Sequence, residues 1–189
     1  MTDKEPLIQK LSHGNHDHRN DLCEEHPYGH IGQITGIVLF LIVWVLDSFI
    51  FKFSTVPANF IPLAIRLGFA ALCFLAAAYF ALKSHQVIFE EFRDPPRVID
   101  TGLFSIVRHP LYLSVLLIYV GLFLTTLSLF SLAIFIVIFL FYDYIARFEE
   151  EKLLEAFGEA YASYRGKTPK WFPRIRPQAP VKRDPAKKE

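Results

Sequence analysis

An arginine, a histidine and a proline stand together at the mouth of a long apolar run, as Arg108-His109-Pro110. Proline is favoured at the first position of a helix, and the residue before it is disfavoured inside one. The sequence therefore predicts a helix that begins at Pro110 with His109 as its cap. Because helix N-termini attract anions, Arg108, His109 and the nearby Tyr112 could form a site for a carboxylate or phosphate. The alternative is that Arg108 only anchors a membrane helix and His109 only caps it.

A second group of candidates is the run Arg147-Phe148-Glu149-Glu150-Glu151. Consecutive helical residues project about 100° apart, so at least one of the three carboxylates must face inward if the segment packs on the protein. An inward Glu149 or Glu150 could bind a cation. The alternative is a solvated helix face that Arg147 supports through i, i+4 ion pairs.

Three apolar runs must position these residues, at 31–51, 60–82 and 111–142. About 20 apolar residues cross a bilayer as one helix, so each of the first two runs predicts one span. The third run is too long for one helix, and we interpret residues 125–128 as a turn within it. The expected fold is an all-α polytopic membrane protein with four transmembrane helices. Helices 3 and 4 would form a tight helical hairpin, followed by a cytosolic C-terminal helical extension.

Antiparallel pairing of helices 3 and 4 would place the start of one beside the end of the other. One helix end then offers the anion site at Pro110, and the other offers the carboxylates of Glu149 and Glu150. A ligand that carries both a carboxylate and an ammonium group, such as an amino-acid moiety, would fit between them.

The charged segments predict the orientation in the membrane. With four spans, both termini and the loop after the second span share one side, which carries nearly all the lysines and arginines. The positive-inside bias places that side in the cytosol, which means the inner membrane if the source is bacterial. We expect a polar histidine-rich tail at 1–30 without a signal peptide, a membrane domain at 31–176 and a charged tail at 177–189. The bilayer is the expected partner, and no nucleic acid is.

Two charges lie inside the first two spans, Asp47 and Arg66, at similar depth. A charge within a span is usually paired or functional, and we favour an ion pair between these two over a polar pocket lining. The tail could bind a transition metal through its histidines. These are His13, His16, His18, His26 and His30. Their spacing matches no defined metal site, and we predict none.

Over roughly residues 66–174 the chain resembles the integral-membrane methyltransferases typified by isoprenylcysteine carboxyl methyltransferase and its prokaryotic relatives. The combination of motifs and their spacing carries this resemblance, and no single motif does. The pieces are Thr101-Gly102-Leu103-Phe104 before Arg108-His109-Pro110-Leu111-Tyr112, the hairpin, Glu149-Glu150 with Leu153, Phe157-Gly158-Glu159-Ala160-Tyr161-Ala162-Ser163-Tyr164, and Trp171-Phe172-Pro173.

The resemblance implies S-adenosylmethionine as the methyl donor, bound at the cytosolic ends of the helices. The family's arginine-histidine-proline-x-tyrosine pattern falls on Arg108, His109, Pro110 and Tyr112, and its paired glutamates fall on Glu149 and Glu150. Arg108 or His109 would then hold the donor's carboxylate, and one of the glutamates its ammonium group.

The resemblance also suggests residues for the remaining parts of the site. The adenine would need an apolar slot from Leu103, Phe157 or Tyr161, with Gly102 beside it in the cofactor site. Arg147 and Tyr164 are candidates to orient the acceptor, on position only.

The resemblance leaves the methyl acceptor open. Some relatives have further membrane helices where this chain has its polar tail, so a lipophilic or small carboxylate, thiol or amine would each fit. Two other functions compete with methyl transfer. One is an NADPH-dependent membrane reductase of the steroid-reductase type, for which one arginine offers few phosphate contacts. The other is a non-enzymatic metal-handling membrane protein that uses the histidine-rich tail.

Overall fold

The computed structural model describes residues 29–90 and 97–173, and every regular element in this part of the chain is a helix. The long elements are α1 (Gly29–Val45), α2 (Leu63–His85), α3 (Pro110–Thr126), α4 (Leu129–Phe157) and α5 (Glu159–Lys167). Short turns of helix join them, at η2 (Leu46–Phe51), η3 (Val56–Asn59), η4 (Gln86–Glu90) and η5 (Gly102–Ser105). The all-helical prediction is confirmed for the described residues. The two predicted tails lie almost wholly outside them, and so do four of the five tail histidines.

Three of the helices are long and apolar enough to cross a membrane, which indicates an integral membrane protein. They are Gly29–Phe51, Leu63–Ile88 and Leu129–Phe157. The remaining predicted span, helix 3, is represented by α3, which is apolar but has only 17 residues. A helix of that length rises about 26 Å, less than the roughly 30 Å of a hydrocarbon core.

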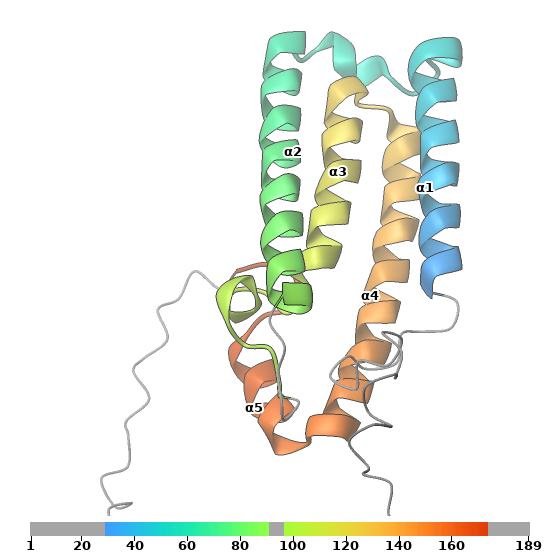
Figure 1. Ribbon diagram of the computed structural model, residues 1–189. Coiled ribbons are helices and arrows are strands. Elements are labelled where there is room, and N and C mark those ends of the chain that lie inside the picture. Colours follow the sequence, from blue (N-terminus) through green and yellow to red (C-terminus); the bar gives the residue numbers. More distant parts are fainter. Residues whose placement is uncertain (1–28, 91–96, 174–189) are drawn as a thin grey trace, which may run out of the picture.

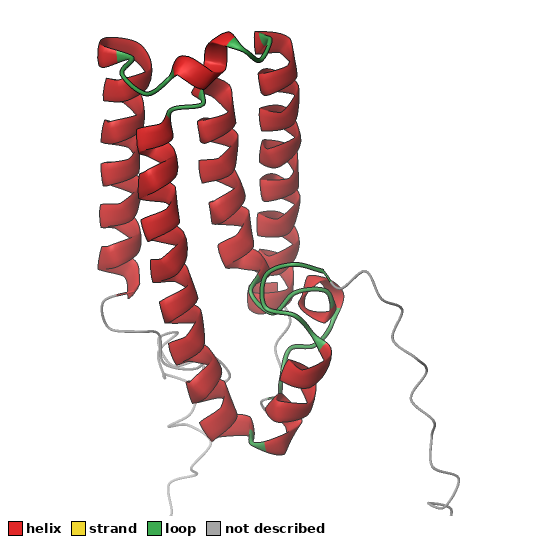
Figure 2. Cartoon of the chain, turned by 180° about the vertical axis from the view of Figure 1, so that it is seen from behind, coloured by secondary structure: helices red, strands yellow, loops and turns green. Residues whose placement is uncertain are grey.

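Figures 1 and 2 show the long helices running side by side, with α3 between α2 and α4 and with α1 beside α4. The α3–α4 connection is Leu127 and Ser128, inside the predicted turn. However, α3 packs mainly along α2, whereas α4 packs mainly on α1. Small buried residues explain the first contact, because Ala70, Ala77 and Gly121 let the backbones of α2 and α3 approach closely.

Aromatic rings lie between α3 and α4 instead. Tyr112 and Tyr142 have ring centroids 5.3 Å apart, and Tyr119 and Phe135 have centroids 6.4 Å apart. Rings of this size keep two helix axes apart, and the two helices diverge away from their short connection (Figure 1). Tyr112 near the start of α3 and Glu149 near the end of α4 lie at these diverging ends.

The predicted ion pair between Asp47 and Arg66 is wrong. Buried Asp47 accepts hydrogen bonds from the Ser54 backbone N–H at 3.1 Å, from the Ser54 hydroxyl and from the Ser128 hydroxyl at 2.6 Å. Arg66 donates to the carbonyl oxygens of Ile61 at 3.1 Å and Thr125 at 2.7 Å. Asp47 therefore binds the α3–α4 connection through Ser128, and Arg66 binds the end of α3 through Thr125. Neither charge needs the other as a partner.

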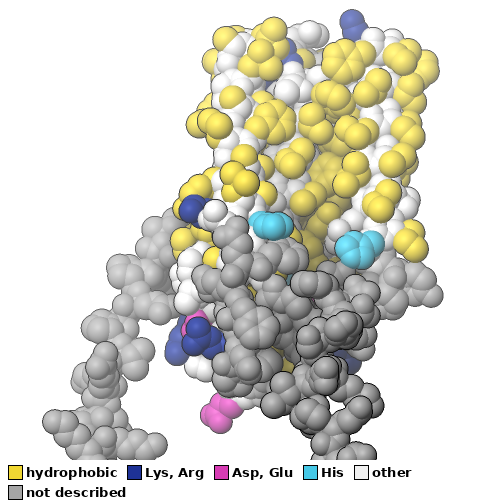
Figure 3. All heavy atoms as spheres, viewed as in Figure 1, with side chains coloured by type: hydrophobic (Ala, Val, Ile, Leu, Met, Phe, Trp, Pro, Cys, Tyr) yellow, Lys and Arg dark blue, Asp and Glu magenta, His cyan; other side chains and the backbone are white. Residues whose placement is uncertain are grey.

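The outer surface of the helices is apolar over most of their length. Figure 3 shows hydrophobic side chains covering the helical part, with charged side chains gathered mainly toward one end. Large side chains such as Phe69, Leu75, Val137 and Leu140 are exposed. Such a surface is unfavourable in water and favourable in lipid, which agrees with the three candidate spans.

The predicted helical extension is confirmed by α4, which continues to Phe157, and by α5. Gly158 separates them with φ +52° and ψ −126°, a backbone conformation that residues with a Cβ rarely adopt. This turn sends α5 back toward the N-terminus of α3 (Figure 2), with Tyr161 and Tyr164 buried. The positions of both tyrosines therefore depend on Gly158.

Replacing Gly158 by Ala should destabilise the C-terminal part of the protein by about 1–3 kcal/mol, the cost of a strained backbone. The matched control is Gly166→Ala, because Gly166 has open space at its Cβ position and lies within α5. Alanine at that helical position should be neutral or stabilise by about 0.5–1 kcal/mol. Thermal unfolding in detergent and hydrogen exchange of α5 would measure both effects. Equal midpoints for the two variants would contradict the role of the Gly158 turn.

Candidate functional site

The N-terminus of α3 has the form that the sequence predicts. Pro110 is its first residue, and His109 caps it with φ −122° and ψ 61°. The cap is made by backbone only, because no His109 side-chain hydrogen bond to the helix is present. Since the imidazole is not used for capping, it can turn toward α4, where Glu149 and Glu150 lie.

Glu150 is the buried anchor of this region, with 2% of its surface exposed. Its Oε1 lies 2.9 Å from both Nε and Nη2 of Arg108 and 3.0 Å from Nε2 of His109. Its Oε2 lies 3.5 Å from Nε of Arg165. A carboxylate only accepts hydrogen bonds, so the Nε2 proton of His109 points at Glu150. One buried carboxylate thus fixes residues from α3 and α5 against α4.

Arg108 is held on its other side by backbone carbonyl groups. Its Nη1 donates to the carbonyl oxygens of Arg165 at 3.0 Å and Thr168 at 2.7 Å. A guanidinium has five N–H donors, and these two contacts with the two to Glu150 occupy four of them. Arg108 therefore joins the α3 N-terminus to the end of α5 and has little capacity left for a ligand.

Glu149 faces the other way, toward a cavity. It accepts a hydrogen bond from the Tyr112 hydroxyl, and its Oε2 lies 3.7 Å from Nδ1 of His109. The His109 and Tyr112 rings are stacked at 5.7 Å with an interplanar angle of 2°. These contacts set a carboxylate beside the first turn of α3, where the helix dipole is positive.

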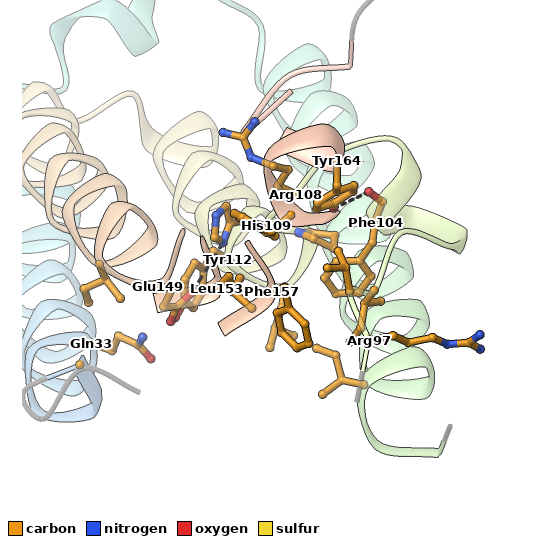
Figure 4. Close-up of a pocket in the computed structure, with 18 of the residues that line it drawn as sticks. Gln33, Arg97, Phe104, Arg108, His109, Tyr112, Glu149, Leu153, Phe157 and Tyr164 are labelled. Atoms are coloured by element: carbon orange, nitrogen blue, oxygen red, sulfur yellow. Dashed lines mark hydrogen bonds and ion pairs between the residues drawn. The ribbon is translucent and has the colours of Figure 1, made fainter. Parts of the chain in front are cut away.

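The cavity has a volume of about 320 Å³ and is lined by the N-terminus of α3 and by one face of α4, among other segments. Figure 4 shows side chains from α1, α3, α4 and the segment before α3 around it. Its lining residues are Gly29, His30, Gln33, Ile88, Arg97, Val98, Ile99, Phe104, Arg108, His109, Pro110, Leu111, Tyr112, Ile145, Glu149, Leu153, Phe157, Tyr161 and Tyr164. Most of them are apolar, with a few polar groups among them, which is typical of small-molecule sites.

Tyr164 closes one wall of the cavity. Its hydroxyl donates to the Phe104 carbonyl oxygen at 2.7 Å and so ties α5 to η5 (Figure 4). Burial raises the pKa of the Tyr161 and Tyr164 hydroxyls well above their ordinary value. Both side chains therefore remain neutral hydrogen-bond donors at physiological pH.

The structure brings most of the site residues predicted from the sequence into one place. Those that line the cavity are Arg108, His109, Tyr112, Glu149, Phe157, Tyr161 and Tyr164. Glu150, Gly102 and Leu103 are not among the lining residues, since Glu150 and Leu103 are buried in packing contacts. Arg147 is also outside, with its side chain 73% exposed and paired with Asp143 at 2.7 Å.

Several lining residues were not predicted from the sequence. On α4 they could have been predicted, because Ile145, Glu149, Leu153 and Phe157 recur every four residues and so share one helix face. The N-terminus of α1 with Gln33, and the segment 97–99, have no such pattern and reach the cavity only through the fold. Within 29–90 and 97–173, no three His, Cys, Asp or Glu side chains gather as metal ligands could.

Comparison with known proteins identifies relatives of the chain. Residues 61–160, more than half of the sequence, match the phospholipid methyltransferase family. The cobalt-zinc-cadmium resistance protein CzcN of Cupriavidus metallidurans is 31% identical over 142 residues, which are 74% of this chain and 63% of that protein. The chain thus matches less than two thirds of the length of this curated relative. The family match contains α2, α3, α4 and both glutamates of the site.

Proposed function

Because the chain belongs to the phospholipid methyltransferase family, we propose that it is a membrane methyltransferase that moves a methyl group from S-adenosylmethionine to a lipophilic or small acceptor. The observation that carries the proposal is the pairing of the Glu149 carboxylate with the N-terminus of α3 at the edge of an apolar cavity. This pairing suits a ligand with one ammonium and one carboxylate group.

The residues fit the amino-acid part of the donor when each is given one role. Glu149 faces the cavity and would accept from the ammonium group. The first-turn amides of α3 would bind the carboxylate, and His109, whose ring nitrogens face Glu150 and Glu149, would orient Glu149. Arg108 and Glu150 would hold these residues in place, because their own polar groups are mostly paired with each other and with α5.

The apolar side of the cavity fits the rest of the donor. Phe104, Leu153, Phe157 and Tyr161 would surround the adenine, whose faces pack well on aromatic and aliphatic side chains. Leu103 would support this wall from behind, since it is buried in η5 beside Phe104.

Methyl transfer requires alignment of the two reactants and exclusion of water from the site more than it requires acid or base catalysis. S-adenosylmethionine supplies a methyl group on a sulfonium, and a carboxylate or thiolate acceptor can attack it without losing a further proton. The apolar wall and the Tyr164 contact to Phe104 would exclude water and fix the two reactants in line. Tyr164 would act as a wall rather than a base, because its raised pKa keeps its proton in place.

We also propose the topology that the sequence predicts. In it α3 crosses as the third of four spans and forms a hairpin with α4, and local thinning of the bilayer compensates for its 17 residues. The polar end with the cavity and both termini would lie in the cytosol, since the lysines and arginines gather there.

A second candidate is a role in metal resistance, which the name of the relative from Cupriavidus metallidurans suggests. It would use the histidine-rich residues 1–28. Deletion of these residues discriminates the two functions. A role in metal resistance predicts that a zinc titration detects binding to the full chain and not to the shortened chain. The methyltransferase proposal predicts that the shortened chain keeps its methyl transfer activity.

S-adenosylmethionine should stabilise the purified protein in detergent. At about 100 times its Kd, a ligand that binds only the folded state adds about 2.7 kcal/mol, which corresponds to roughly 5–11 °C in the unfolding midpoint. NADPH at the same concentration should leave the midpoint unchanged. A shift with NADPH alone would favour the reductase and sink the proposal. Labelled donor offered with prenylcysteine, phosphatidylethanolamine or small thiols would then identify the acceptor.

A further inference from the structure

The four residues after α5 return to the middle of the molecule. We name residues 168–171 the C-terminal strap. The backbone N–H of Arg108 donates to the Pro169 carbonyl at 2.9 Å, and the Arg108 guanidinium donates to the Thr168 carbonyl at 2.7 Å. The strap is therefore hydrogen-bonded to the residue that precedes His109.

Asp143 on α4 holds the other half of the strap. Its Oδ1 accepts from Lys170 Nζ at 2.7 Å and from Trp171 Nε1 at 2.9 Å. Lys170 Nζ also donates to the Asp143 backbone oxygen at 3.1 Å. The Asp143 and Lys170 side chains are only 17% and 15% exposed, so this pair is less screened than a surface ion pair.

Trp171 carries this attachment to the site. Its ring is 5.7 Å from that of His109, and again 5.7 Å from that of Phe139 within the core. His109 thus has two ring neighbours, Tyr112 from its own helix and Trp171 from the strap. Neither Asp143 nor Trp171 lines the cavity, so their influence on a ligand can only be indirect.

We propose that Asp143 is a positioning residue for the methyl-transfer site. By binding Lys170 and Trp171 it fixes the strap, and the strap fixes the imidazole of His109 beside Glu149. The inference rests on the proposed function for its effect on the donor, whereas the link from Asp143 to His109 stands on the contacts alone. Since displacement of a binding group by about 1 Å costs up to 100-fold in rate, losing this link should be measurable.

Asp143→Asn and Lys170→Met test the link, because both keep the size of the side chain and remove its charge. We expect about a 10-fold rise in the Kd of S-adenosylmethionine per correctly folded molecule, with the KM of the acceptor unchanged. Lys170→Arg should restore binding. Glu155→Ala is the matched control, since it breaks an exposed ion pair with Lys152 on the same helix.

A purely structural role would reduce the folded fraction and leave the Kd of the remaining molecules unchanged, and that result would overturn the proposal. A measurement without donor separates it from the proposed function. The chain has two tryptophans, so a Trp44→Phe background isolates Trp171. Its ring is buried against His109 and Phe139, so Asp143→Asn should shift its emission to longer wavelength as the strap loosens. An unchanged emission maximum would exclude the link, even if the wild-type protein binds no donor.

Discussion

Replacing Glu150 by Ala should destabilise the protein more than any other single change at the site. The carboxylate is almost fully buried and contacts Arg108 at 2.9 Å, His109 at 3.0 Å and Arg165 at 3.5 Å. Removing one partner of such a pair leaves a buried charge uncompensated, which costs about 3–5 kcal/mol. For a chain of this size we expect the unfolding midpoint in detergent to fall by roughly 6–20 °C.

Glu151→Ala is the control for this prediction, because Glu151 is the next residue on α4 and is exposed. Its free energy of unfolding should stay within about 0.5 kcal/mol of the wild type, as is usual for surface substitutions. The double variant Arg108→Met, Glu150→Met should be less destabilised than either single change, since it leaves no buried charge unpaired. If Glu150→Ala and Glu151→Ala unfold at the same temperature, the buried contacts of Glu150 do not organise the site.

The boundaries of the site could be predicted because they depend on local chemistry. Proline fixes the start of α3 at Pro110, and Gly158 fixes the end of α4, whatever the rest of the chain does. Tyr161 and Tyr164 lie three residues apart on α5, and both line the cavity. Each of these inferences used residues within one or two helical turns of each other.

The different positions of Glu149 and Glu150 could not be predicted from the sequence. Neighbours on a helix differ by about 100° in direction, and either could have faced the cavity. What decides between them is Arg108, whose guanidinium is fixed by carbonyl groups nearly sixty residues further along the chain. In the proposed site, that placement gives Arg108 a supporting role. The position of Arg147 also depends on a contact that the sequence does not reveal. Its partner Asp143 faces the strap and not the cavity, so Arg147 lies outside the cavity.

Which helices pack against each other could not be predicted from the sequence either. The lengths of the apolar runs predicted the spans, but the close partner of α3 is α2, because small residues lie on both helices. Asp47 and Arg66 were at matching depth, and that suggested a pair. The hydroxyls of Ser54 and Ser128 satisfy Asp47 instead, and the carbonyl groups of Ile61 and Thr125 satisfy Arg66. Within a membrane any nearby polar group can serve in this way.

Replacing Glu149 by Gln should cause the largest loss of function without unfolding. The side chain lies at the cavity wall, and glutamine can still accept the Tyr112 hydrogen bond. What it loses is the charge opposite the ammonium group of the donor. Hydrogen bonds to charged groups contribute about 1.5–3 kcal/mol, so the Kd of S-adenosylmethionine should rise roughly 10- to 100-fold. Binding of labelled donor to the detergent-solubilised protein measures this change.

A donor analogue without its amino group makes the test specific to the proposed contact. For this analogue the affinity of the wild type should already be weak, and Glu149→Gln should weaken it no further. Glu151→Gln, one helical residue beyond Glu150 and exposed, should bind both compounds as the wild type does. Equal losses for the two compounds would mean that Glu149 shapes the cavity and does not bind the ammonium group. Full affinity of Glu149→Gln for S-adenosylmethionine would remove the amino-acid site from this end of α3 altogether.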